Sequence, residues 1–357
     1  MARSEKNLTA VFTDTASAIR AKTNTTENIC PLDFADKINS IQTGGGGMKA
    51  FFEAGGKCAY SDAVTFNDSI KYSDTENVTN AYKMFYICDK LVEAPNIDTS
   101  NITNMSNMFA TCTQLTKVPQ LNTSKARNMN YMFYYCTNLK EIPMLDTSSV
   151  NDMSYMFYNC TSLKTIPNLD TSWAYDASYM FQNDEVLREV PSLNLRRASN
   201  MDRMFWGCRS LTTVNELKTF SGVTFNGMFG YCSNLLSVPL LVTDKNKSVN
   251  MAVAFYNCSK LTSIPEINAR WVTNLSSTFD GCSSLETIHM KDIHVSFNIS
   301  ASTKFTRTAL LEIINNLHTI VPTSATPIQT LTMGETNLAK LTDEDKAIAT
   351  NKGWTLL

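Results

Sequence analysis

The sequence predicts a repeat solenoid, because one motif recurs nine times at a spacing of 24 residues between residues 72 and 297. The motif is Met-Phe-x-x-Cys, with two degenerate copies at Ala254-Phe255 and Thr278-Phe279 after a two-residue insertion near Lys245. Leucine and proline recur in step with it. The leucines are Leu91, Leu115, Leu139, Leu163, Leu187, Leu211, Leu235, Leu261 and Leu285. Columns that stay in register predict coils that stack on one another and share one continuous core.

Each unit contains a short apolar segment, Leu-x-x-Ile/Val-Pro-x-Leu, which predicts a parallel strand. The proline has no N–H to donate, so we expect strand pairing there to be short or interrupted. Asp/Asn-Thr-Ser follows at residues 98–100, 122–124, 146–148 and 170–172. It predicts a turn whose side-chain oxygen caps backbone N–H groups.

The Met-Phe segment predicts one short α-helical or 3-10 turn in each coil. Met153, Met156 and Phe157 have the i, i+3, i+4 spacing of a single buried helical face. Eight of the ten cysteines occupy one column of this segment, which Asp184 interrupts. We expect reduced thiols buried in the core. Disulfides between neighbouring coils are the alternative.

These strings resemble the BspA-like leucine-rich repeats of bacterial surface proteins, which also occur in mycoplasma lipoproteins. The hallmark is Met-Phe-x-x-Cys-x-x-Leu-x-x-Ile-Pro-x-Leu-Asp-Thr-Ser, and the resemblance covers residues 72–297. Departures occur at Asp184, at residues 215–225 and in the last two units. The resemblance implies a right-handed leucine-rich-repeat solenoid with an adhesive or ligand-binding role. It implies no reaction.

The ends of the chain differ from the repeats. Residues 1–43 predict a small helical hairpin, 44–47 a glycine linker, 48–71 an N-terminal cap and 298–357 an α+β C-terminal cap. Such a hairpin is too small to fold alone, so we expect it to dock on a partner or self-associate. The expected docking residues are Leu8, Val11, Phe12, Ile19, Leu32 and Ile38.

The segment from Leu8 to Thr23, followed by Pro31-Leu-Asp-Phe-Ala-Asp-Lys-Ile38, resembles the start of phage tail and fibre proteins. That resemblance implies attachment to other tail or baseplate proteins of a virion. The first eight residues lack the apolar stretch of a secretory signal. We therefore expect a protein made in the host cytoplasm and assembled into a virion.

Composition and motifs argue against nucleic-acid binding, membrane insertion and catalysis. A net charge of −2 gives no basic face for nucleic acid, and no apolar run is long enough for membrane insertion. There is no Gly-x-Ser-x-Gly, no His-Glu-x-x-His and no Cys-x-x-Cys. We expect no enzyme activity, no cofactor and no metal ion. Turn capping accounts for Asp74, Asp98, Asp146 and Asp170 without calcium.

Aromatic residues recur at three registers of the repeat and are the candidate binding residues. Tyr, Trp and Arg dominate binding hot spots, although half-buried spacers between coils are an equal alternative. The first register holds Tyr131, Tyr155, Tyr179 and Arg203, the second Tyr134, Tyr158 and Trp206, and the third Trp173 and Trp271.

Two main hypotheses of function follow. In the first, the chain is a phage tail-fibre or tail-tip adhesin whose solenoid binds a glycan or protein of the host surface. In the second, it is a bacterial surface or secreted adhesin of the same repeat family. A virion decoration protein without a receptor is a further alternative, and a homo-oligomer is compatible with each.

Overall fold

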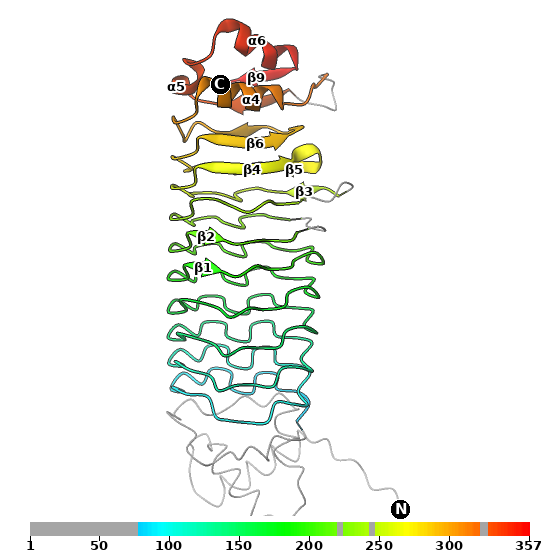
Figure 1. Cartoon of the computed structure of the whole chain (residues 1–357), viewed down its shortest axis with the longest axis vertical. Helices are drawn as coiled ribbons and strands as arrows, with labels where there is room; N and C mark the ends of the chain where they lie inside the picture. Colours follow the sequence, from blue (N-terminus) through cyan, green and yellow to red (C-terminus); the bar gives the residue numbers. More distant parts are fainter. Residues whose placement is uncertain (1–77, 220–223, 243–246, 322–327) are drawn as a thin grey trace, which may run out of the picture.

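The computed structural model describes residues 78–219, 224–242, 247–321 and 328–357. These residues form an elongated solenoid whose coils stack along the long axis, with the C-terminal helices at one end (Figure 1). The predicted helical hairpin, glycine linker and N-terminal cap lie outside the described residues, as do Asp74 and all six docking residues, Leu8, Val11, Phe12, Ile19, Leu32 and Ile38.

Neighbouring coils pair in parallel at one corner of the solenoid. Single backbone bridges join Asn80, Asn104, Asn128, Asp152, Asp176, Asn200, Thr224 and Asn250 in succession. Within a coil, the side chain of this residue caps the turn that follows: Asp152 Oδ1 accepts from the Ser154 N–H at 3.0 Å. This corner is therefore a column of polar residues, because each side chain caps a turn of its own coil while the backbone pairs with the neighbouring coil.

The regular strands are short and parallel, as the sequence predicts. β1 (Glu189–Val190) pairs with β2 (Thr213–Val214), β3 (Val249–Asn250) with β5 (Val272–Asn274), and β4 (Ser263–Asn268) with β6 (Thr287–Lys291). β1 ends just before Pro191, and the β4–β6 register shifts on either side of Pro265. β6 runs without a break, since His289 stands where other coils have proline.

The helical turn predicted for the Met-Phe segment is wrong; this segment is a series of tight turns. The Met156 N–H donates to the Met153 carbonyl at 3.2 Å, but the Tyr155 N–H crosses to the Ser178 carbonyl of the next coil at 3.0 Å. Tyr155 and Asn159 have φ of 57° and 62°, a left-handed conformation that no right-handed helix can include. Within the described repeats, the only helix is the 3-10 helix η2 (Ala269–Trp271).

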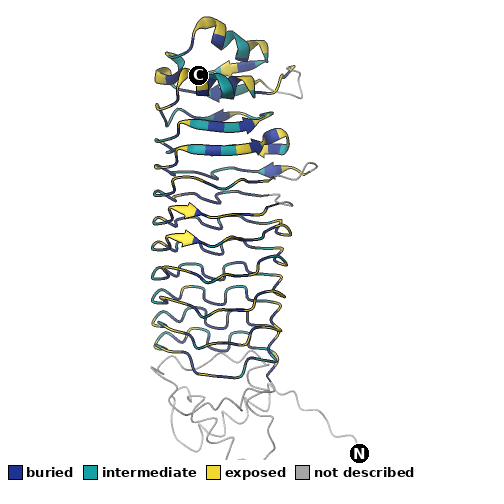
Figure 2. Ribbon diagram, viewed as in Figure 1, coloured by how far each residue is buried: buried dark blue, intermediate teal, exposed yellow. Residues whose placement is uncertain are grey.

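The core consists of columns of like side chains. The phenylalanine rings from Phe85 to Phe279 stack coil on coil with centroids 5.2 to 6.0 Å apart. In β4 the buried Ile264 and Ile267 are separated by two less buried residues, whereas buried and less buried positions alternate along β6 (Figure 2). This alternation points every second side chain at the core.

The cysteine column is reduced and buried, which confirms the prediction of core thiols. The eight cysteines from Cys88 to Cys282 are free. Each thiol from Cys112 onward donates to the carbonyl of the phenylalanine 27 residues earlier, or 29 where the insertion intervenes, at 2.9 to 3.1 Å. The column thus adds a hydrogen bond to each stacking step. Burial raises the pKa of these thiols, to about 12 at Cys282.

Asp184 occupies the thiol position in one coil and is completely buried. Its Oδ1 accepts from the Cys160 N–H at 2.7 Å, whereas its Oδ2 has no hydrogen-bond partner among the described residues. Burial raises the pKa of this carboxyl well above its usual value. A protonated Asp184 would retain the donor that cysteine supplies in the other coils.

The C-terminal end continues the parallel stacking and adds α-helices. A sheet of β7 (Phe297–Asn298), β8 (Gln329–Thr332) and β9 (Trp354–Leu356) follows the last coil, together with α4 (Arg307–Asn315), α5 (Glu335–Leu338) and α6 (Asp343–Asn351). Thr342 and Asp345 form a capping box at the start of α6. Arg307 ties α4 to that box through two 2.7 Å hydrogen bonds to Asp345. In the described part of the chain, no helix has the length and apolar character needed to cross a bilayer.

Candidate binding surface

Three tyrosines of the first predicted register stack in a row across three coils. The ring of Tyr155 lies 4.4 Å from Tyr131 on one side and 4.4 Å from Tyr179 on the other, with interplanar angles of 8° and 6°. Their backbones are held by ladder hydrogen bonds, so the spacing of the coils sets the spacing of the rings. The row is therefore built by the repeat itself.

A second row lies beside the first. Tyr134 and Tyr158 stack at 5.0 Å and contact the first row, with Tyr134 5.2 Å from Tyr131 and Tyr158 5.6 Å from Tyr155. Tyr135, which the sequence analysis did not identify, packs 4.7 Å from Tyr134 and is 37% exposed. We call these six residues the tyrosine cluster: Tyr131, Tyr134, Tyr135, Tyr155, Tyr158 and Tyr179.

The cluster combines both alternatives left open by the sequence, because its rings pack between coils and yet remain partly exposed. Both faces of the Tyr155 ring are covered by the neighbouring rings, and its hydroxyl group interacts with theirs. Ring edges and the remaining hydrogen-bonding capacity of these hydroxyl groups are what a ligand can contact. Burial is the main cause that raises the pKa of Tyr131, Tyr134, Tyr155 and Tyr158. The phenols therefore stay neutral and can both donate and accept hydrogen bonds.

Backbone conformation does not explain why tyrosine occupies these positions. Tyr131, Tyr135, Tyr155 and Tyr179 have φ between 56° and 59°, a left-handed conformation that costs a residue with a β-carbon about 1 kcal/mol. The same conformation occurs in other coils at Lys83, Arg203 and Val253 in the register of Tyr155, and at Ile87 and Thr111 in the register of Tyr135. The left-handed backbone therefore belongs to the repeat itself, and it assigns no role to the tyrosine side chains.

A second aromatic group adjoins the cluster along the stack. Trp206 lies 5.0 Å from Tyr231 and 6.5 Å from Tyr256, and the Arg203 guanidinium lies 5.0 Å from its ring centroid. A β-carbon on Gly230 would come within 2.3 Å of the Trp206 ring, so this glycine makes room for the indole. Arg203 Nε is buried without a hydrogen-bond partner in the described structure.

The third predicted register is separate from the tyrosine cluster. Trp173 is 53% exposed and is covered on one side by Arg197, whose guanidinium lies 3.9 Å from its ring centroid. Trp271 belongs to η2 and packs partly buried against the core, with Arg270 5.6 Å from its ring. Neither tryptophan has a ring contact with the cluster among the described residues.

Two other surface features lie outside the cluster. The aspartates of the Asp-Thr-Ser turns cap backbone N–H groups; Asp98 accepts from Ser100 at 2.8 Å and Asp170 from Ser172 at 2.9 Å. An open groove of about 530 Å³ runs beside these turns, lined by Leu121, Met144 and their neighbours. It contains no titratable group other than Asp146, so its chemistry is mainly that of turn backbone and apolar side chains.

Comparison with known proteins gives a family and no assigned activity. The model of the family described as "Mycoplasma protein of unknown function, DUF285" matches residues 56–96, 92–192, 137–240 and 184–293. No curated protein matches this chain.

Two crystal structures show similarity at low scores. A leucine rich cell surface protein from Faecalibacterium prausnitzii A2-165 is 18% identical with a TM-score of 0.31, over 58% of this chain and 68% of that one. A leucine-rich repeat protein from Bacteroides ovatus ATCC 8483 is 15% identical with a TM-score of 0.24, over 76% of this chain and 85% of that one.

Proposed function

The chain belongs to the family described as Mycoplasma protein of unknown function, DUF285, and from that premise we propose that it is a bacterial surface adhesin that binds a glycan through the tyrosine cluster. The observation that carries the proposal is the stacked row of Tyr131, Tyr155 and Tyr179, whose partly exposed side chains extend over three successive coils. Bacterial display is preferred to a virion because the matching family is described from a cellular organism.

The phage hypothesis rests on residues 1–47, which lie outside the described residues and before the start of the family match at residue 56. Docking through that segment to tail or baseplate proteins stays a prediction. The location of the chain in cells or particles distinguishes the two hypotheses.

A glycan suits the chemistry of the cluster better than a charged ligand does. The phenols are neutral and offer hydroxyl groups at the regular spacing of the coils, which complements the hydroxyl groups of successive sugar residues. Tyrosine also supplies rigid contact area with little loss of side-chain entropy on binding. Among the nearby arginines, Arg209 lies 3.5 Å from Glu185, while Arg197 and Arg203 lie over the rings of Trp173 and Trp206.

The test is capture of the purified full chain by immobilised cell-surface extract, with the extract treated by periodate or by protease. We expect periodate to abolish capture and protease to leave it unchanged. The variant Tyr134→Ala/Tyr158→Ala should lose capture, whereas Tyr175→Ala should retain it, because Tyr175 is 51% exposed and has no ring contact with the cluster among the described residues. Equal capture of both variants would refute the cluster as the site; sensitivity to protease alone would indicate a protein ligand.

A further inference from the structure

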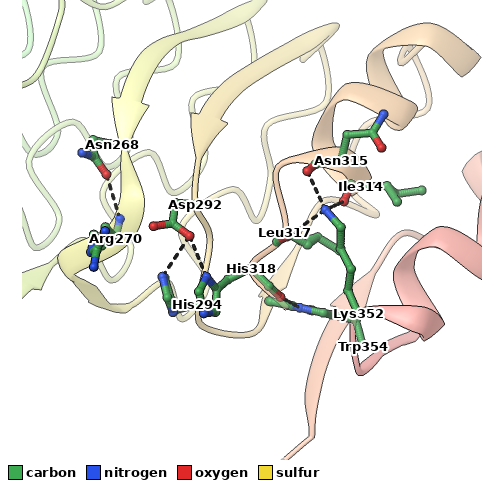
Figure 3. Close-up of polar contacts among 10 residues, drawn as sticks. All are labelled: Asn268, Arg270, Asp292, His294, Ile314, Asn315, Leu317, His318, Lys352 and Trp354. Carbon is green, nitrogen blue, oxygen red and sulfur yellow. Dashed lines mark hydrogen bonds and ion pairs between the residues drawn. The ribbon is translucent and has the colours of Figure 1, made fainter. Parts of the chain in front are cut away.

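Three metal-ligating side chains converge where the solenoid meets its C-terminal elements. Asp292 and His294 follow β6, and His318 follows α4. His318 Nδ1 lies 2.8 Å and His294 Nε2 3.1 Å from the same oxygen, Asp292 Oδ1 (Figure 3). All three ligand atoms lie within 4.8 Å of one another.

The backbone places the two histidines side by side. Ile293 and Leu317 form a parallel bridge, in which the Ile293 N–H donates to Asn316 at 3.0 Å and the His318 N–H to Ile293 at 2.9 Å. His294 and His318 follow these two residues directly, and their rings stack with centroids 3.7 Å apart. The His318 carbonyl also accepts from Trp354 Nε1 at 2.8 Å. Ladder pairing thus brings both imidazoles together before any ligand arrives.

The electrostatics of the cluster favour a cation. His294 Nε2 is buried and lacks a hydrogen-bond partner of good geometry among the described residues. One carboxylate oxygen is therefore shared by two imidazole nitrogens, and stacked rings would repel each other if both were protonated.

We propose that Asp292, His294 and His318 bind a divalent transition-metal ion of the zinc class. Bonds of 2.0 to 2.2 Å in a tetrahedral site place neighbouring ligand atoms about 3.3 Å apart, so the observed 2.8 and 3.1 Å need to open by only a few tenths of an ångström. Neutral imidazole and carboxylate are ligands that such ions accept. The three side chains are partly exposed, which leaves water to complete the coordination.

Nearby basic side chains have partners of their own. His289 Nδ1 lies 2.7 Å from Glu312, and Lys352 donates to the carbonyls of Asn315 at 2.6 Å and Leu317 at 2.9 Å. Arg270, at the same register one coil before His294, lies near Trp271. A bound metal ion would cross-link the last coil to the segment after α4, and would stabilise this end of the stack.

The experiment measures Zn²⁺ content and thermal unfolding of the full chain after dialysis against Zn²⁺, with a parallel sample in chelator. We expect one ion per chain and a higher Tm with Zn²⁺, both retained in the control His289→Asn. His294→Ala and His318→Asn should each lower the affinity at least about tenfold.

Co²⁺ provides a second readout that does not depend on the stability of the variants. The proposal predicts ligand-field bands of nitrogen and oxygen coordination without a thiolate charge-transfer band. A thiolate band would assign binding to cysteine and overturn the proposal. Absence of stoichiometric binding, or equal affinity in both histidine variants, would overturn it as well.

Discussion

The carboxyl group of Asp184 accepts a 2.7 Å hydrogen bond from the backbone N–H of Cys160, at the position where other coils place a thiol. The carboxyl is completely buried, and its second oxygen has no partner within the described structure. A single coil of the stack therefore contains a group whose protonation is coupled to folding.

The stability of the protein should depend on pH through Asp184. Because burial raises its pKa in the folded state, the folded chain holds a proton that the unfolded chain releases above a pKa of about 3.9. Stability is then greatest below that pH and falls by up to about 1.4 kcal/mol per pH unit as the pH rises towards the folded-state pKa. Urea unfolding between pH 4 and 8 measures this slope.

Asp184→Asn is the matched control, since its amide supplies a permanent donor of nearly the same shape. We expect the variant to be similar to wild type near pH 4 and at least about 1 kcal/mol more stable at pH 7. If the two unfolding curves keep a constant separation across this range, Asp184 is ionised in the folded protein.

The cysteine column should resist modification until the chain unfolds. The thiols are buried and their pKa values are raised, so both access and thiolate fraction are low. We expect the eight column cysteines to react with an alkylating reagent at the rate of unfolding. Peptide mapping of partly labelled protein measures this for each site. Rapid labelling of Cys136 or Cys160 in the folded chain would contradict the packing described.

Gly230 should control the position of Trp206 without controlling the fold. In Gly230→Ala the three atoms nearest to the new β-carbon all belong to the Trp206 ring, the first at 2.3 Å, so the indole has to move. We expect altered tryptophan fluorescence and a change of less than about 1 kcal/mol in the free energy of unfolding. Trp206→Phe, alone and combined with Gly230→Ala, establishes that the spectral change comes from this indole.

Gly207→Ala is the contrasting variant, because Gly207 has a φ of 78° and its β-carbon would come within 2.4 Å of Asn183 Oδ1. There we expect destabilisation of about 1 kcal/mol or more. Similar stabilities for the two alanine variants would show that backbone strain at Gly207 is small.

The core could be predicted from the sequence because a column repeated coil after coil has the same environment in each. Phe157 and Cys160 illustrate this, since their counterparts in other coils are equally buried.

The conformation of the Met-Phe segment could not be predicted from its apolar spacing, which single tight turns share with a helix. The sequence feature that indicates the tight turns is the presence of Asn and Gly at positions such as Asn107, Asn183 and Gly207, because these residue types tolerate a left-handed backbone.

The candidate sites could be predicted from the sequence only where the 24-residue register was traced from coil to coil. Tyr155 and Tyr179 were found as one column, whereas Tyr135 was missed because the coils on either side of it have Thr111 and Asn159 at that position. His294 and His318 are separated by 24 residues, the repeat length, so the same register continued past the last motif would have paired them. Asp292 could not be added from spacing, because its contact depends on the left-handed backbone at that residue, with φ of 57°.

The most direct test of the tyrosine cluster as a binding site removes its hydroxyl groups while keeping its rings. Tyr131→Phe/Tyr155→Phe/Tyr179→Phe preserves the stacking at 4.4 Å, and Tyr175→Phe is the control outside the cluster. Titration with glycan released from the cell-surface extract should give a Kd at least about tenfold higher for the triple variant, equivalent to about 1.4 kcal/mol. The Kd of the control should be unchanged. An unchanged Kd for a triple variant that melts at the wild-type temperature would contradict the account.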